Sequence, residues 1–146
     1  MDANRQPVRL QWTDQFATGS PTIDEQHRQL FAHLNQFAAL LAPGPSDPKD
    51  LVFILQFLEF LEEYARTHFS YEEQCMERYR CPAHQKNQMA HEHFQQMIRD
   101  FKARSLAGGF RREMLDELSR MLNHWVQGHI LNLDTELKPC IERRAG

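Results

Sequence analysis

The chain has 146 residues, of which 41% are hydrophobic and 25% are charged, and its formal net charge is −3. These values are typical of one globular domain that can bury its own hydrophobic core. A slightly acidic chain offers no basic face for nucleic acid. The longest apolar stretch, "LVFILQFLEFL" at 51–61, is interrupted by Gln and Glu and is about half as long as a membrane span. We therefore expect neither a nucleic-acid nor a membrane partner.

The cysteines indicate the compartment. Cys75, Cys81 and Cys140 are odd in number and form no Cys-x-x-Cys pair, which is typical of a reducing environment. The first ten residues, "MDANRQPVRL", show no basic-then-apolar secretion signal. We expect a cytoplasmic protein. The unusual number is the 8 histidines, whose role must be decided by their positions.

The N-terminal third predicts an arm followed by a helix. Residues 1–20 show no helical period, and we expect an extended arm whose Trp12 and Phe16 pack onto the rest of the domain. The first helix is expected to open at Thr22, because Glu25 three residues later fits a capping box. Its inner stripe alternates steps of four and three residues and consists of Ile23, His27, Leu30, Leu34, Phe37 and Leu41. The sequence "PGPSDP" at 43–48 ends this helix.

The middle of the chain predicts two further helices. The second is expected to run from Pro48, capped by Asp47, to about Arg80. Its inner stripe is Leu51, Leu55, Leu58, Leu61, Ala65, His68, Glu72, Cys75 and Tyr79. Pro82 separates it from the third helix, which ends at Gly108-Gly109. The third stripe is Asn87, His91, Phe94, Ile98 and Phe101.

The last part of the chain completes an all-α fold. A fourth helix is expected from about Phe110 to Ile130, followed by a short helical tail from Asp134 to Cys140. The fourth stripe is Leu115, Leu118, Leu122, Trp125 and His129. Four amphipathic helices with short connections predict an antiparallel up-down four-helix bundle with an extended N-terminal arm. We expect one domain over 1–146, with the arm at 1–20 and the bundle and tail at 22–142.

Each inner stripe also carries polar side chains that are costly to bury. They are His27 on the first helix, His68 and Glu72 on the second, Asn87 and His91 on the third, and His129 with Asp134 at the end of the fourth. Taken singly, His27 fits a satisfied core histidine, His68 with Glu72 a helix-surface pair, and Asp134 a helix cap. Together they place imidazoles and carboxylates on the buried faces of four helices, which is the composition of a metal site inside a bundle.

The segments around these residues resemble the ligand segments of the hemerythrins. The segments are "IDEQHRQLF" at 23–31, "HFSYEE" at 68–73, "HEHF" at 91–94 and "HILNLD" at 129–134. In addition, "VRLQWTDQFATGSPTIDEQH" at 8–27 resembles the N-terminal arm of the bacterial members of that family. Other metal classes fit less well, since the chain has neither the Glu-x-x-His of ferritin-like bundles nor the His-Glu-x-x-His of zinc proteases.

The resemblance implies two iron ions in an oxo- or hydroxo-bridged, non-haem centre that binds O₂ reversibly. It implies one iron on His27 and His68, the other on His91 and His129, and two bridging carboxylates, Glu72 and Asp134. It also implies an apolar O₂ pocket formed by Phe69, Trp125, Val126 and Ile130. The expected function is O₂ storage, delivery or sensing by a monomer, without enzymatic activity.

The chain departs from the family at position 87, where the family pattern places another histidine and this sequence has Asn87. An amide oxygen is a poorer donor to iron than imidazole. His84 is about 10 Å from His91 along a helix axis, and could substitute only if the helix start deforms. We expect solvent or Asn87 to fill the position in preference to His84. Two alternatives stay open: a di-iron enzyme acting on peroxide or NO, and an interaction module depleted of metal.

Overall fold

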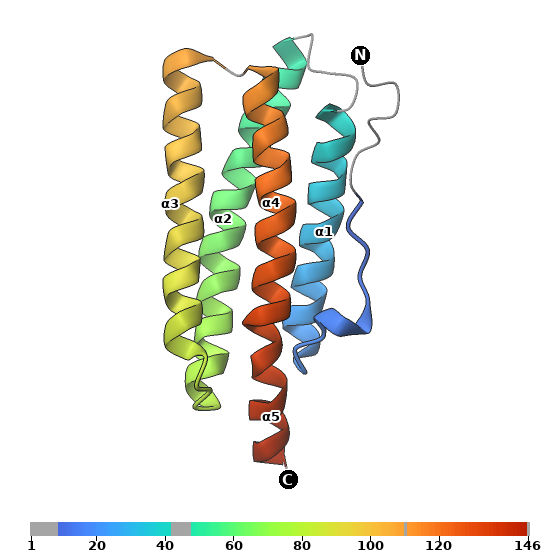
Figure 1. Ribbon diagram of the computed structural model, residues 1–146, viewed down its shortest axis with the longest axis vertical. Helices are drawn as coiled ribbons and strands as arrows, with labels where there is room; N and C mark the ends of the chain where they lie inside the picture. The colour runs from blue at the N-terminus through green and yellow to red at the C-terminus, as the bar shows by residue number, and fades with distance from the viewer. Residues whose placement is uncertain (1–8, 42–47, 110, 146) are drawn as a thin grey trace.

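The structure is a computed structural model that describes residues 9–41, 48–109 and 111–145. Four long helices, α1 (Pro21–Leu41), α2 (Pro48–Arg78), α3 (His84–Gly108) and α4 (Arg112–Asn132), alternate in direction along the chain (Figure 1). The described residues contain no β-strand. The predicted antiparallel four-helix bundle is therefore confirmed. The expected features at Asp47 and Phe110, and the side chain of Leu51, lie outside the described residues.

Three shorter elements flank the bundle. A 3₁₀ turn, η1 (Asp14–Phe16), precedes α1, and a second one, η2 (Asp134–Glu136), leads from α4 into α5 (Leu137–Ala145). The C-terminal helix extends to Ala145, five residues beyond the expected tail. It continues the line of α4 at the end of the bundle where α1 begins (Figure 1).

The start of α1 corrects the expected capping box. The helix begins at Pro21, and the N–H of Ile23 donates to Ser20 Oγ at 3.3 Å, so Ser20 is the capping residue. Pro21 then occupies the first helical position, where its fixed φ suits the helix and no N–H is needed. Asp24, predicted only as part of the helix, accepts from the N–H and hydroxyl of Thr18 at 2.9 and 2.8 Å.

The end of α2 also differs from the prediction, because the helix stops two residues before Arg80. The helix ends at Arg78, and Arg80 has a positive φ of 50°. The N–H of Cys81 donates to the Met76 carbonyl at 2.8 Å, and that of Arg80 to the Glu77 carbonyl at 3.0 Å. This is a Schellman cap with arginine where glycine is usual. It turns the chain back so that α3 can begin at His84.

Among the described residues, the core consists of two apolar clusters. The larger one fills most of the bundle and includes Leu30, Phe69, Phe94 and Ile130. The smaller one lies beneath α5 and consists of Ile23, Met76, Cys81, Ala83, Leu137 and Cys140. The buried candidate ligands and Asn87 lie near the boundary between these clusters, whereas Ser105 and Asn123 are buried elsewhere along α3 and α4. The candidate ligands and Asn87 therefore form a polar layer between the two apolar clusters.

The N-terminal arm packs as expected on α1. Trp12 and Phe16 contact each other with ring centroids 5.6 Å apart, and both contact Phe31. The backbone N–H of Leu10 donates to Asn35 Oδ1 at 2.8 Å, and Asn35 Nδ2 donates to the Leu10 carbonyl at 2.9 Å. The arm thus covers the outer side of α1.

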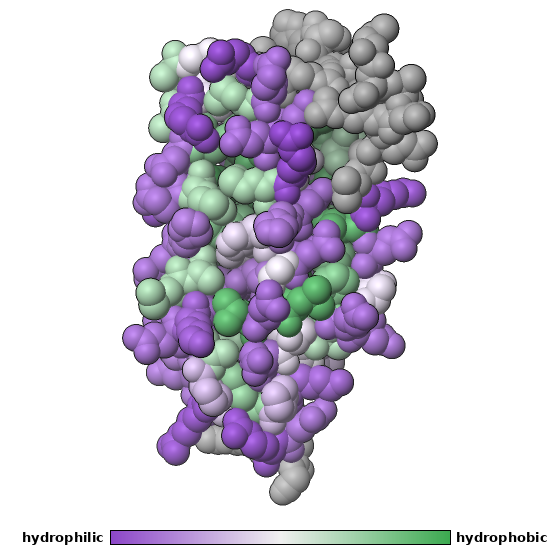
Figure 2. Space-filling view, viewed as in Figure 1, coloured by the Kyte–Doolittle hydropathy of each residue, from purple (hydrophilic) through white to green (hydrophobic). Residues whose placement is uncertain are grey.

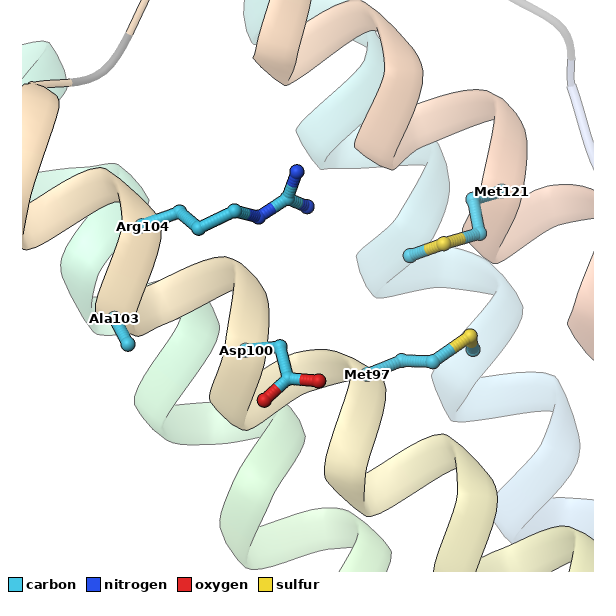
Figure 3. Close-up of a pocket in the computed structure, with 5 residues that line it drawn as sticks. All are labelled: Met97, Asp100, Ala103, Arg104 and Met121. Atoms are coloured by element: carbon cyan, nitrogen blue, oxygen red, sulfur yellow. The ribbon is translucent and has the colours of Figure 1, made fainter.

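One face of the molecule is mostly polar. Figure 2 shows hydrophilic side chains over most of this face, with hydrophobic residues in smaller patches among them. Figure 3 shows a surface pocket between α3 and α4, in which Arg104 and Met121 point toward each other. Its lining residues, Met97, Asp100, Ala103, Arg104 and Met121, include none of the candidate ligands. No helix in the described part of the chain has the length and hydropathy to cross a membrane.

Candidate metal centre

The six expected ligands come together in the polar layer of the bundle. None of them is more than 7% exposed. His27 lies near the start of α1, His68 and Glu72 near the end of α2, His91 near the start of α3, and His129 near the end of α4. Because neighbouring helices run in opposite directions, these positions meet at one end of the bundle (Figure 1). Asp134 reaches the same place from η2.

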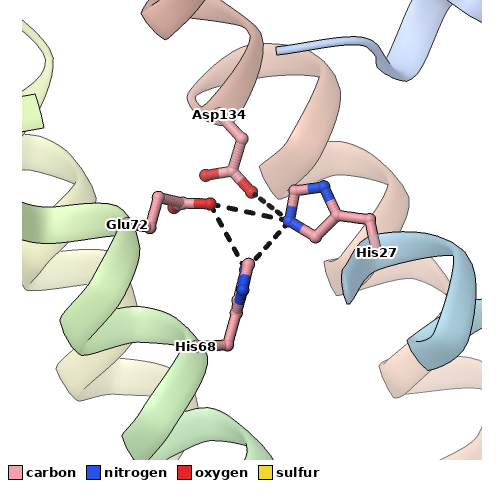
Figure 4. A group of neighbouring side chains, drawn as sticks. All are labelled: His27, His68, Glu72 and Asp134. Atoms are coloured by element: carbon pink, nitrogen blue, oxygen red, sulfur yellow. Dashed lines mark hydrogen bonds and ion pairs between the residues drawn. The ribbon is translucent and has the colours of Figure 1, made fainter. Parts of the chain in front are cut away.

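The first ligand group is His27, His68, Glu72 and Asp134 (Figure 4). The two Nε2 atoms of His27 and His68 are 2.9 Å apart. Glu72 Oε2 lies 3.5 Å from His27 Nε2 and 3.3 Å from His68 Nε2. Asp134 Oδ2 lies 3.3 Å from His27 Nε2. Two imidazole nitrogens and two carboxylate oxygens thus point toward one position.

The second group is formed by His91 and His129 with the same two carboxylates. The Nε2 atoms of His91 and His129 are 3.0 Å apart. Glu72 Oε1 is 3.1 Å from His91 Nε2, and Asp134 Oδ1 is 3.0 Å from His129 Nε2. Each carboxylate therefore directs one oxygen to each histidine pair.

Unsatisfied buried atoms show that these residues fit a metal. Seven described buried side-chain atoms have no hydrogen-bond partner, and five of them belong to this layer: His27 Nδ1, Glu72 Oε2, Asn87 Oδ1, His91 Nδ1 and Asp134 Oδ1. The two carboxylate oxygens, Glu72 Oε2 and Asp134 Oδ1, face the ligand groups, whereas the two Nδ1 atoms lie on the opposite side of their rings from Nε2. Buried polar atoms normally have partners, because an unpaired one costs free energy. Within each group the ligand atoms all lie within 4.8 Å of one another. Imidazole and carboxylate donors at this spacing suit a transition metal such as iron.

The electrostatics of the metal-free site favour a positive charge. Burial lowers the pKa of His27, but hydrogen bonds and charge from Asp134 and Glu72 outweigh it and raise the pKa from 6.5 to about 9. Burial raises the pKa of the Glu72 carboxyl, but hydrogen bonds from His27, His68 and His91 outweigh burial and hold this pKa well below its usual range. The ionised carboxylates therefore hold a proton on His27 near the position that a cation would take.

A residue behind the ligands orients the imidazole of His68, another lies close to that of His91, and the sequence did not predict either of them. His68 Nδ1 is 2.6 Å from Gln26 Oε1, which can only accept, so Nδ1 carries the proton and Nε2 is free to bind a metal. The Tyr64 ring stacks on His68, and its hydroxyl donates to the Gln26 carbonyl at 2.8 Å. Glu73 Oε2 is 3.5 Å from His91 Nδ1. Gln26 and Glu73 each directly adjoin a predicted ligand in sequence, which was the available signal.

Asn87 lies in the layer, whereas His84 does not join either ligand group. Asn87 is fully buried, and its Nδ2 donates to Glu72 Oε1 at 2.7 Å and to Met76 Sδ at 3.2 Å. Its Oδ1 has no partner. His84 is the first residue of α3, is only partly buried, and is absent from both groups of potential metal ligands.

The four expected pocket residues line one small cavity. Phe69, Trp125, Val126 and Ile130, with Leu30, line a space of about 10 Å³ beside His27, His68, His129 and Asp134. That is room for roughly one water-sized molecule. The Phe69 ring stacks on His91 with centroids 3.8 Å apart, and Trp125 stacks on His129 at 4.3 Å. The aromatic walls therefore also hold two candidate ligands in place.

Comparison with known proteins identifies the family. The family model described as "Hemerythrin HHE cation binding domain" matches residues 18–141. The chain belongs to the hemerythrin family. It is 30% identical over 127 residues to the Bacteriohemerythrin of Pseudomonas paraeruginosa, covering 87% of this chain and 78% of the relative. It is 30% identical over 129 residues to the Bacteriohemerythrin of Clostridium acetobutylicum, covering 86% of this chain and 95% of the relative.

A third relative extends this pattern. The Bacteriohemerythrin of Stenotrophomonas maltophilia is 27% identical over 121 residues, which cover 83% of this chain and 74% of that protein. The matched region 18–141 of this hemerythrin-family chain contains all six expected ligands and Asn87. Membership implies a cation-binding protein with iron as its metal, and the ligand groups in the structure agree with it.

Proposed function

We propose that this hemerythrin-family protein holds two iron ions and binds O₂ reversibly for storage, delivery or sensing, without catalysing a reaction. The observation that carries the proposal is the pair of carboxylates, each of which directs one oxygen to each histidine pair. A single metal ion would use only one of the two groups. Carboxylates shared in this way suit two ions held next to each other.

The proposed ligand roles follow from the two groups. His27 and His68 would hold one ion, His91 and His129 would hold the other, and Glu72 and Asp134, which belong to both groups, would be shared by the two ions. The two negative charges offset part of the charge of the ions. When bound, the iron pair supplies the electrons that reversible O₂ binding requires. Gln26 keeps the proton of His68 on Nδ1, away from the metal side.

The lining of the cavity is suited to a small apolar ligand. Its walls are mainly aliphatic and aromatic side chains, and it borders ligands of both groups. Such walls exclude water and leave room for a diatomic gas. Trp125 and Phe69 restrict the cavity and stack on His129 and His91. We propose that the same walls would limit the access of solvent to the ligand groups.

Asn87 favours a second candidate function, an enzyme acting on peroxide or NO. The amide donates to Glu72 and does not extend an imidazole toward His91. Each ion would then have two imidazoles, so both ions would keep positions for an exchangeable ligand. An interaction module without metal is less consistent with six buried ligands in two complete groups. We further propose that the protein is cytoplasmic, since its three cysteines are free thiols, and that it acts as a monomer.

Optical spectroscopy separates these functions. The protein is loaded with Fe(II) without oxygen, exposed to O₂, and then purged with argon over several cycles. A carrier gives an absorption band that appears with O₂ and disappears on purging. Irreversible bleaching together with catalytic removal of added peroxide or NO would favour the enzyme instead.

A further inference from the structure

Two of the three cysteines lie together at the end of the bundle, outside the metal ligand groups. Cys81 lies in the turn after α2, Cys140 lies on α5, and both side chains are buried at 5% and 2% exposure. Both are free thiols. Each donates to the same atom, the carbonyl oxygen of Glu136, at 3.4 Å in both cases. Two thiols that are distant in sequence thus meet at one backbone oxygen.

The surroundings fix the position of Cys81. The N–H of Cys81 donates to the Met76 carbonyl in the cap of α2. The side chains of Cys81 and Cys140 both belong to the smaller apolar cluster. Burial and the neighbouring Cys140 thiol raise the pKa of Cys81 to about 11. Cys81 therefore stays a protonated thiol in the reduced protein, and is unsuited to react first with an oxidant.

Cys140 has a different environment. Arg143, which is exposed and lies three residues later on α5, donates from Nη2 to Cys140 Sγ at 3.4 Å. Cysteines that react with peroxide are found beside positively charged groups. The two thiols therefore suit different roles. Cys140, whose sulfur accepts a hydrogen bond from a guanidinium group, suits the role of the attacking cysteine, and the neighbouring Cys81 suits that of the resolving cysteine.

We infer that Cys81 and Cys140 form an intramolecular disulfide when the protein meets hydrogen peroxide. The Cys140 sulfur attacks the peroxide, a sulfur–oxygen bond forms, the oxygen–oxygen bond breaks, and water leaves. The Cys81 sulfur then attacks the Cys140 sulfur, the sulfur–sulfur bond forms, and the hydroxyl leaves with the Cys81 proton as a second water. The two thiols lose two electrons and two protons, which reduce one peroxide to two waters.

The bond would fasten α5 to the turn between α2 and α3. The closed segment contains α3, α4 and η2, and so carries His91, His129 and Asp134. A cross-link over such a long segment restricts the unfolded chain. The oxidised protein should therefore unfold at a higher temperature than the reduced protein.

The test treats the full chain with hydrogen peroxide, both as isolated and after metal removal, followed by intact mass measurement and peptide mapping. We expect the mass to fall by two hydrogen atoms, and Cys81 and Cys140 to be recovered in one linked peptide pair with Cys75 free. The protein as isolated and the metal-free protein should both react, because the two sulfurs form hydrogen bonds with Glu136 and Arg143, which are not candidate ligands. The test thus stands apart from iron or O₂ binding.

Variants assign the two roles. Cys75→Ser should leave the product unchanged. Cys81→Ser should prevent it and leave a sulfenic acid on Cys140 that dimedone traps. Arg143→Gln should slow disulfide formation severalfold, whereas Arg66→Gln, at an exposed arginine paired with Glu63, should not. Three free thiols after treatment of the unmodified chain, or a mapped disulfide that contains Cys75, would overturn the inference.

Discussion

Asn87 illustrates how one residue sets the chemistry of a buried site. The amide is too short to take the place of an imidazole while it donates to Glu72, and it leaves its own oxygen unpaired. Its backbone position is nevertheless one helical turn before His91, on the same buried face of α3. The geometry therefore allows a longer side chain at this position to reach the ion beside His91.

The first prediction concerns that substitution. Asn87→His should add a third imidazole to the group of His91 and His129 and tighten its ion roughly tenfold or more, the scale of ligand and near-ligand effects at metal sites. Calorimetric titration of the metal-free protein with Fe(II) under argon measures this. His84→Ala is the control and should leave both affinities unchanged. Loss of one ion in His84→Ala, with no gain in Asn87→His, would show that His84 already supplies a ligand.

The second prediction concerns Gln26, which holds His68 by its Nδ1 proton. Gln26→Met keeps the length of the side chain and removes the acceptor, so His68 loses its orientation. Affinity for the ion of His27 and His68 should fall by roughly 10- to 100-fold. The matched control is Gln74→Met on the exposed side of α2, which should change nothing. Equal metal affinities of Gln26→Met and the unmodified chain would show that Gln26 does not support metal binding by His68.

At the scale of elements, helix periodicity was sufficient to predict the bundle, but it predicted the buried face of α2 only in part. Leu55, Cys75 and Tyr79 are only partly buried, whereas Ile54 and Met76, outside the predicted stripe, are fully buried. The α3 stripe of Asn87, His91, Phe94, Ile98 and Phe101 is buried as expected, because these spacings are local. Helix ends were less predictable. The cap of α2 uses Arg80 at positive φ, and no glycine marks it in the sequence. The contacts of Asn87 with Glu72 and of Gln26 with His68 join different helices, so no local pattern contains them.

The third prediction tests the corrected start of α1. Ser20→Ala removes the oxygen that accepts from the Ile23 N–H, and should lower the free energy of unfolding by about 1 kcal/mol. Thr22→Ala, at the position expected from the sequence, should change it by less than about 0.5 kcal/mol, the usual range for surface changes. Urea unfolding of the metal-free variants measures both. A larger loss of unfolding free energy in Thr22→Ala than in Ser20→Ala would instead support the capping box predicted from the sequence.

At the scale of the whole molecule, the buried layer couples stability and metal binding to pH. The pKa of His27 in the folded, metal-free protein is raised to about 9 from 6.5. Because this pKa is raised, the contribution of His27 to the free energy of unfolding is complete below about pH 6.5 and is lost as pH rises toward 9. The pKa of Glu72 is lowered, so its contribution is present above its ordinary value of 4.5 and is lost as pH falls through the lowered value.

The fourth prediction follows from these two directions. The melting temperature of the metal-free protein should fall as pH rises from about 6.5 to 9, and this slope should be absent in His27→Gln. His33→Gln, on α1 beside Phe60 and outside both ligand groups, is the control and should keep the slope. Metal binding must displace the His27 proton, so bound iron should be lost as the solution is acidified. A melting temperature that stays constant over this range in the unmodified chain would contradict the assignment.

The central claim is that Glu72 and Asp134 join two histidine pairs into a centre for two iron ions. Iron per chain after anaerobic loading and removal of loosely bound metal tests it most directly. We expect about two iron ions per chain, since each of the two ligand groups contains two imidazoles and shares both carboxylates. A loaded protein that retains one iron or none would contradict it.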